Sequence, residues 1–206
     1  TSQYSEVYEL PPGHVRFNEF VGKFGQSFNQ TDRLNLTKLL IAKFADLHGI
    51  KIAHRDIADH SLWLSPSKEI ALSNFISAYH QPIGTVGDYR NSLSVGAVEV
   101  KEMLDDASTT PFQKDVHALG LVSWHLLTAQ RMSPKSLENI QNEMLSSSEW
   151  YADVLLDAVT GKFKDASAFF DALKRAEPQG ESIPTFDDSE LEAYRHPINH
   201  TRQFPD

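Results

Sequence analysis

The segment from Val116 to Leu127 constrains the fold of this chain more than any other, because it is apolar on almost every side of a helix. A surface helix has an apolar stripe on one face and polar residues on the other, whereas a helix that is apolar all round is buried. Its large apolar side chains are Leu119, Leu121, Val122, Trp124, Leu126 and Leu127. The sequence therefore predicts a central buried helix around which a mainly α-helical domain is built.

Further helices and one hairpin are predicted around this core. Residues 36–47 show the spacing of one helical face, and Gly49 supplies a C-terminal stop. The predicted buried face consists of Leu36, Leu39, Leu40, Phe44 and Leu47. Segments 150–159 and 166–173 have the pattern of two more helices. Short apolar runs at 62–64 and 69–72 flank the turn at 65–67, which predicts a small β-hairpin.

Composition excludes several classes of function. The chain has 206 residues, which suits one domain with an extension, and it carries a net charge of −9 with a pI near 5.4. Non-specific binding to nucleic acid or to anionic membranes needs a basic surface. No apolar run reaches the roughly 18 residues of a transmembrane helix, and the absence of cysteine excludes disulfides and thiolate metal sites. We expect a cytoplasmic protein that binds neither nucleic acid nor a membrane.

The stretch from His54 to Leu62 resembles the catalytic loop of protein kinases, H-R-D-L-x-x-x-N. In that family the Asp accepts the substrate hydroxyl proton and the Asn holds a magnesium ion. Here the Asp is kept as Asp56, while Ser61 stands where the Asn is expected. The family's next motif is D-F-G, whose Asp also binds magnesium. The matching stretch of this chain reads Asn74-Phe75-Ile76.

Three weaker matches follow in the family's order. Ala97-Val98-Glu99 is similar to A-P-E, and the stretch from Asp115 to Gly120 is similar to D-V-W-S-x-G. The stretch from Lys162 to Phe169 is similar to R-F-x-x-A-x-x-F, found near the end of many bacterial serine/threonine kinase domains. The resemblance covers about residues 4–175 and concerns the C-terminal lobe only. It implies a mainly α kinase-like large lobe with a short β-hairpin and without the small lobe.

The front of a kinase domain has no counterpart here. The chain contains no G-x-G-x-x-G loop and no lysine on a V-A-I strand. Residues 6–13 resemble the last small-lobe strand running into the hinge. We expect a hinge-like segment at 1–13, a kinase-like C-lobe at 14–176 and an acidic linker with a tail at 177–206. Six acidic residues and no Lys or Arg lie between Glu177 and Glu192, a pattern typical of a mobile linker.

The resemblance implies a role for each residue of the catalytic-loop region. Asp56 is either a catalytic base or a structural relic held by hydrogen bonds of the loop, and Arg55 belongs to the same motif. His54 and Phe75 match positions that pack into the family's internal hydrophobic column. The degenerate nucleotide and magnesium positions are Ser61, Leu62, Asn74 and Phe75. No metal site is expected.

Two further expectations concern the scaffold. As in the family, Asp115 is expected to accept backbone N–H bonds from the catalytic loop; the alternative is a solvent-facing Asp at a helix start. Glu99 matches the Glu of A-P-E, which pairs with an Arg near the final helices, and Lys162 occupies the matching Arg position. We therefore expect a Glu99–Lys162 contact, weaker than an Arg pair because a lysine lacks the planar fork that grips a carboxylate twice.

The chemistry of the two metal positions decides between functions. Magnesium prefers carboxylate oxygens, but Asn74 offers a neutral amide, and the Ser61 hydroxyl is shorter than the expected Asn. This favours a pseudokinase that regulates or binds a protein partner or a neighbouring domain of the same polypeptide, with no cofactor. The alternative, favoured by the retained His54-Arg55-Asp56, is a divergent ATP- and magnesium-dependent serine/threonine kinase whose small lobe lies outside this chain. A third possibility is a likeness of fold alone, with an unrelated site.

Overall fold

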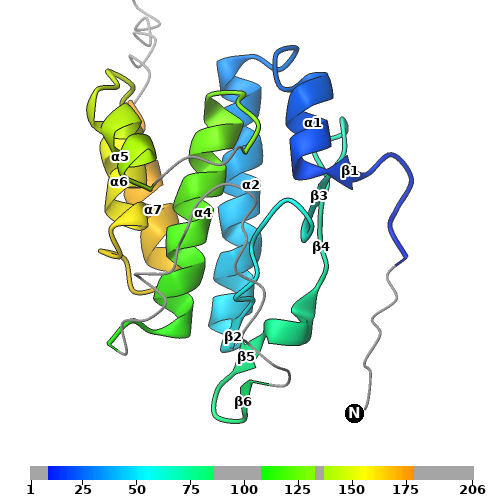
Figure 1. The fold of residues 1–206 in the computed structure, drawn as a ribbon, viewed down its shortest axis with the longest axis vertical. Helices are drawn as coiled ribbons and strands as arrows, with labels where there is room; N and C mark the ends of the chain where they lie inside the picture. Colours follow the sequence, from blue (N-terminus) through cyan, green and yellow to red (C-terminus); the bar gives the residue numbers. More distant parts are fainter. Residues whose placement is uncertain (1–8, 86–107, 133–136, 179–206) are drawn as a thin grey trace, which may run out of the picture.

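The computed structural model describes residues 9–85, 108–132 and 137–178 (Figure 1). They form a mainly helical domain, as predicted, and contain two small sheets, of which only the β-hairpin of the first was predicted. The helices are α1 (Phe17–Phe24), α2 (Gln30–Gly49), α4 (Pro111–Leu127), α5 (Leu137–Leu145), α6 (Ala152–Val159) and α7 (Ala166–Ala176). In Figure 1, α2 and α4 lie side by side at the centre, with α5, α6 and α7 on one flank and α1 on the other.

Helix α4 is the buried centre of this domain, which confirms the sequence prediction. Every residue from Asp115 to Leu127 is buried. The helix begins with Pro111 and is capped by Thr110, whose side chain accepts the Gln113 N–H while the Gln113 side chain accepts the Thr110 N–H. This reciprocal cap satisfies two donors that would otherwise lack an intrahelical partner.

Helix α2 ends at Gly49 as predicted, but its buried face differs from the predicted one. Leu39 was expected to face the core and is instead 47% exposed. The buried face consists of Leu36, Thr37, Leu40, Ile41, Phe44 and His48. These residues face α4 and α7, which both pack against α2. The apolar pattern of α2 is broader than one face, so the packing partners, not the pattern, decide which leucine is covered.

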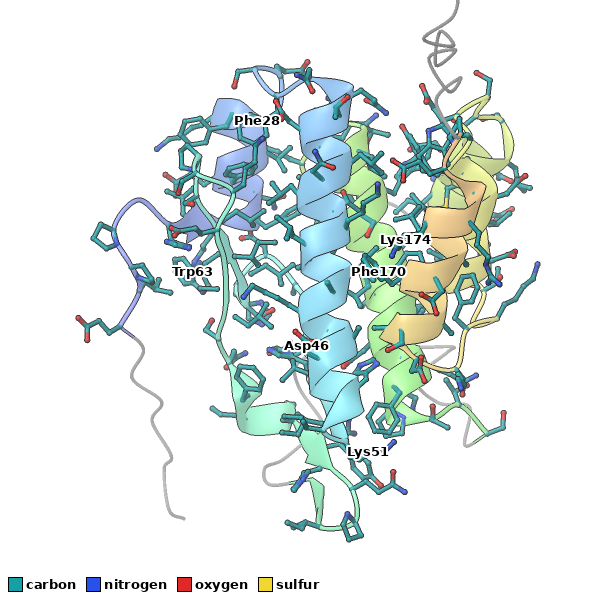
Figure 2. All side chains as sticks on the ribbon, turned by 180° about the vertical axis from the view of Figure 1, so that it is seen from behind. Phe28, Asp46, Lys51, Trp63, Phe170 and Lys174 are labelled. Carbon is teal, nitrogen blue, oxygen red and sulfur yellow. The ribbon has the colours of Figure 1, made fainter. Side chains whose placement is uncertain are left out.

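The predicted hairpin is present. Strands β3 (Leu62–Leu64) and β4 (Ile70–Leu72) pair antiparallel, and β1 (Val15–Arg16) adds a third strand beside β3. Leu62 and Leu64 point into the core, while Trp63 points to the other side, where the Arg16 guanidinium lies 5.5 Å from its ring centroid (Figure 2). Such alternation is what a sheet with one buried face requires. The second sheet consists of β2 (Ile52–Ala53), β5 (Tyr79–His80) and β6 (Gly84–Thr85), and a 3₁₀ turn at Phe75–Ser77 joins β4 to β5.

The last two helices are also confirmed, with small shifts at their ends. Helix α6 begins two residues after the predicted start, and α7 begins at Ala166 as predicted and continues to Ala176. Glu177 follows α7 and pairs with Lys38 of α2, with 2.5 Å between Nζ and Oε2. The rest of the acidic segment from residue 179 lies outside the described residues, and so do residues 1–8 of the expected hinge-like segment. Residues 9–13 form no strand.

Within the described residues, no helix combines the length and the apolar character needed to cross a membrane.

Candidate functional site

The loop that joins β2 to β3 carries the candidate site, and one end of it is fixed by a buried carboxylate. Asp115 Oδ2 accepts the backbone N–H of His54 at 2.6 Å, and Oδ1 accepts that of Arg55 at 2.7 Å. His48 Nε2 donates to the same carboxylate at 3.1 Å, because Nδ1 of this ring accepts the N–H of Ala166 at 2.9 Å. The hydrogen bonds expected of Asp115 are present, and the alternative of a solvent-facing Asp is wrong, since Asp115 is 1% exposed.

The other end of the loop is fixed to α1. Asp59 Oδ1 accepts the backbone N–H of Asn18, in the first turn of α1, at 2.6 Å. The N-cap residue of α1, Arg16, provides no side-chain cap, so Asp59 supplies from the loop the acceptor that this helix start lacks. The Asn18 side chain in turn bonds the backbone N–H and C=O of Met132. The loop is therefore held between α1 and α4.

The Ser61 hydroxyl is hydrogen-bonded within its own loop. Its hydroxyl donates to the carbonyl oxygen of Asp56 at 2.5 Å and accepts the N–H of Ala58 at 2.9 Å. The side chain is completely buried. A hydroxyl that closes a tight turn in this way has no oxygen directed at a ligand, so Ser61 acts here as a turn residue.

Asp56 lies at the centre of the site, and one of its two carboxylate oxygens is shared by two donors. Oδ2 accepts a hydrogen bond from His60 Nε2 at 2.9 Å and another from the Asn74 side-chain amide. Oδ1 is buried and has no hydrogen-bond partner among the described residues. Asn74 has a left-handed backbone (φ 66°, ψ 54°), a conformation that asparagine tolerates better than most residues. Asn74 therefore directs a donor, not an acceptor, toward Asp56.

The surroundings of the two loop histidines shift their pKa values in opposite directions. The hydrogen bond to Asp56 raises the pKa of His60, which is partly exposed, above its ordinary value. Burial lowers the pKa of His54. The His54 ring lies between Phe44 and Phe75, with centroids 5.9 and 4.5 Å away, and it donates from Nε2 to the Ser73 carbonyl oxygen at 2.8 Å. Burial thus disfavours the charged form of His54 in the core, while the contact with Asp56 favours the charged form of His60.

The structure brings together most of the residues predicted from sequence. Asp56, Ser61 and Asn74 meet around the loop, His54 and Phe75 pack behind it, and Leu62 is buried in the core below. Arg55 has a left-handed backbone (φ 66°) at the anchor to Asp115.

The Glu99–Lys162 contact stays a prediction. Glu99 lies outside the described residues. Lys162 pairs with Asp157 of α6, with 2.5 Å between Nζ and Oδ1.

Sequence reasoning missed the roles of His60 and Asp59. The only available signal for His60 was its position four residues after Asp56, which is ambiguous without knowledge of how the loop turns. The Asp59 contact to Asn18 joins residues 41 positions apart, so no local pattern could indicate it.

The residues at the expected magnesium positions do not fit a magnesium ion as they are arranged. A divalent cation needs several oxygen ligands directed at one point. Asn74 points its amide nitrogen at Asp56, and the Ser61 hydroxyl is bonded to the loop backbone. Across the described residues, no three His, Asp or Glu side chains are grouped so that they could hold a metal.

Comparison with known proteins gives one limited likeness. No protein-family model matches the chain. Myosin light chain kinase A from Dictyostelium discoideum is 27% identical over 124 residues, which are 59% of this chain and 40% of that protein. The likeness indicates a relationship to protein kinases. The matched part is less than half of that kinase.

Proposed function

We propose that this chain is a kinase-like C-lobe with impaired catalysis that works as a regulatory or protein-interaction module. The likeness to a protein kinase and the order of motifs from His54 to Phe169 support the class. The proposal that catalysis is impaired rests on one observation, the arrangement of hydrogen bonds around Asp56. Its carboxylate receives hydrogen bonds from His60 and Asn74, two donors from the protein itself.

Phosphoryl transfer makes demands that this site does not meet. The reaction depends on positioning and on metal ions that neutralise the phosphate charge. In this site both groups at the metal positions are used for other bonds, because Ser61 closes the loop and Asn74 binds Asp56. The sequence also contains no Gly-rich phosphate loop. A side chain that accepts a substrate proton must be free to receive it. The Asp56 oxygen Oδ2 already accepts hydrogen bonds from His60 and Asn74, and Oδ1 is buried.

The proposed role is binding to another protein or to a neighbouring domain of the same polypeptide in the cytoplasm. The net charge of −9 supports a protein partner over nucleic acid or an anionic membrane, both of which attract basic surfaces. No cofactor is required for such a role.

A nucleotide-binding experiment tests this proposal. We expect the melting temperature of the chain to change by less than about 1 °C when millimolar ATP and magnesium are added, since a ligand raises stability only through RT ln(1 + [L]/Kd). ATP with EDTA separates metal-dependent binding from non-specific effects. A rise of several degrees that disappears with EDTA contradicts the proposal.

The second candidate function is a divergent ATP-dependent serine/threonine kinase whose small lobe lies outside this chain. It is supported by the intact His54-Arg55-Asp56 and by Asp56 Oδ1, which is buried and finds no hydrogen-bond partner in the part of the chain that the structure describes. An unpaired buried carboxylate oxygen is costly unless a ligand supplies its donor. Under this candidate, a longer polypeptide that includes a small lobe transfers phosphate and loses this activity with Asp56→Asn. Equal activity in the two proteins contradicts it.

A further inference from the structure

Helix α2 and the residue after it leave two large apolar side chains exposed, on a face whose other exposed residues are polar or glycine. Leu39 is 47% exposed and Ile50, directly after the helix, is 63% exposed. Ile50 is the C-cap residue of α2, and its backbone N–H still bonds the Asp46 carbonyl oxygen of the last helical turn, so it adjoins the helical surface. In Figure 2, α2 crosses the middle of the view between the β3–β4 hairpin and α7, and no other element of the ribbon lies in front of it.

Two charges stand between these apolar residues. At 3.6 residues per turn, positions 39, 43, 46 and 50 fall within a sector of about 60° around the helix axis. Lys43 and Asp46 are both exposed. Within the described part of the chain, neither side chain has a hydrogen bond or an ion pair, unlike Lys38 and Asp32 of the same helix. The four residues Leu39, Lys43, Asp46 and Ile50 are called the α2 stripe below.

The order of residues in the α2 stripe is self-complementary. A two-fold axis perpendicular to the helix and midway between residues 44 and 45 places Leu39 opposite Ile50 of a second copy. The same axis places Lys43 opposite Asp46 of that copy. Two-fold interfaces require one surface to match itself in this way. Each apolar residue then meets an apolar residue, and each charge meets its opposite, twice per interface.

We infer that the α2 stripe is a homodimer surface, on which α2 packs antiparallel against α2 of a second copy of this chain. This goes beyond the proposed function and does not depend on it. At a rise of 1.5 Å per residue the stripe is about 17 Å long, so the helix contact alone buries less than the roughly 1,200 Å² of a stable specific interface. The dimer is therefore weak, as expected of a small, transient contact.

Sedimentation equilibrium between about 10 µM and 1 mM tests the inference. The expected result for the 206-residue chain is a concentration-dependent shift from monomer toward dimer. Lys43→Glu places like charges opposite Asp46 and should weaken association about ten-fold or more, because two attractive pairs become two repulsive ones. Asp46→Lys should do the same.

The double variant K43E/D46K is decisive because it exchanges the two charges and restores opposite charges across the axis. Its association should return to within about three-fold of the original protein. Lys23→Glu is the matched control, since the Lys23 side chain is 59% exposed and belongs to α1, on the flank of the domain opposite α7 (Figure 1); it should change association little. Circular dichroism checks that all variants fold, and Leu39→Glu gives an independent disruption of the same surface.

Three outcomes overturn the inference. The first is a chain that stays monomeric at 1 mM, as it would if another protein or another segment of the chain occupied this face. The second is self-association that Lys43→Glu and Lys23→Glu weaken equally. The third is a double variant that associates no better than the single ones.

Discussion

Removal of the Asp115 carboxylate tests the central structural claim about the site, namely that this group holds the loop. Three donors converge on it, from His54 N at 2.6 Å, Arg55 N at 2.7 Å and His48 Nε2 at 3.1 Å. Asp115→Ala leaves all three buried without an acceptor, at about 1–2 kcal/mol each. Arg55 is a non-glycine residue at φ 66°, and its release from that conformation returns about 1–2 kcal/mol. We expect a net loss of about 2–4 kcal/mol of unfolding free energy.

Urea unfolding followed by circular dichroism measures this loss. Asp171→Ala is the matched control, because Asp171 is exposed and a surface substitution should stay within about 0.5 kcal/mol. Asp115→Asn is the conservative variant. It keeps one carbonyl oxygen but turns an NH₂ group toward a donor, so its loss should lie between those of the other two variants.

The outcome that refutes this reasoning is an Asp115→Ala protein as stable as the control. Amide hydrogen exchange gives a second readout, since the His54 and Arg55 amides should exchange faster in Asp115→Asn while the amides in the middle of α2 keep their protection. Unchanged exchange at these two amides would show that the carboxylate does not hold the loop.

Further predictions concern packing and pH. Gly120→Ala should destabilise the domain by about 1–3 kcal/mol, because a Cβ there would lie 2.9 Å from Val159 Cγ2 and 3.1 Å from Ala158 Cβ of α6; Gly49→Ala, where a Cβ meets nothing within 4 Å, is the control in thermal unfolding. Burial lowers the folded-state pKa of His54 and His117 below 6.5, so stability should be complete above pH 6.5 and fall as the pH drops below it, because the unfolded chain binds protons first. His60 should act oppositely: its folded pKa is raised above 6.5 by Asp56, so its contribution is complete below pH 6.5 and is lost as the pH rises through the folded value. Urea titrations of the original protein and His60→Gln between pH 5 and 8 separate the two effects, and a variant whose pH dependence matches the original would contradict the assignment to His60.

Local patterns were sufficient for the elements with strong signals. The all-round apolar stretch from Val116 to Leu127 could only be a buried helix, and the pair of short apolar runs around residues 65–67 could only pair as a hairpin. Motif order also indicated that Asp115 would lie against the loop 60 residues before it. For the site itself, the sequence identified Asp56, Ser61 and Asn74 as a group but not the direction in which each side chain donates.

Where the prediction failed, the missing information was tertiary. Helix α2 has apolar residues around more than half of its circumference, so the sequence alone did not distinguish a buried Leu40 from an exposed Leu39. The direction from which α4 and α7 approach made that choice. The approach left Leu39 and Ile50 outside, with Lys43 and Asp46 between them.

The amino-acid sequence by itself determined helices α2, α4, α6 and α7, the β3–β4 hairpin and the residue types present at the site, because periodicity, turn residues and motif spacing are local properties of the chain. Helices α1 and α5 and the second sheet were not predicted. Only the tertiary structure decided what those side chains bind. Contacts such as Asp59 with Asn18, or His48 with Ala166, join residues 41 and 118 positions apart. The state of Asp56 depends on a loop whose two ends are fixed by α4 and α1. The physical reason is that a hydrogen bond forms only where folding brings donor and acceptor within about 3 Å, and that distance is set by the packing of the whole domain.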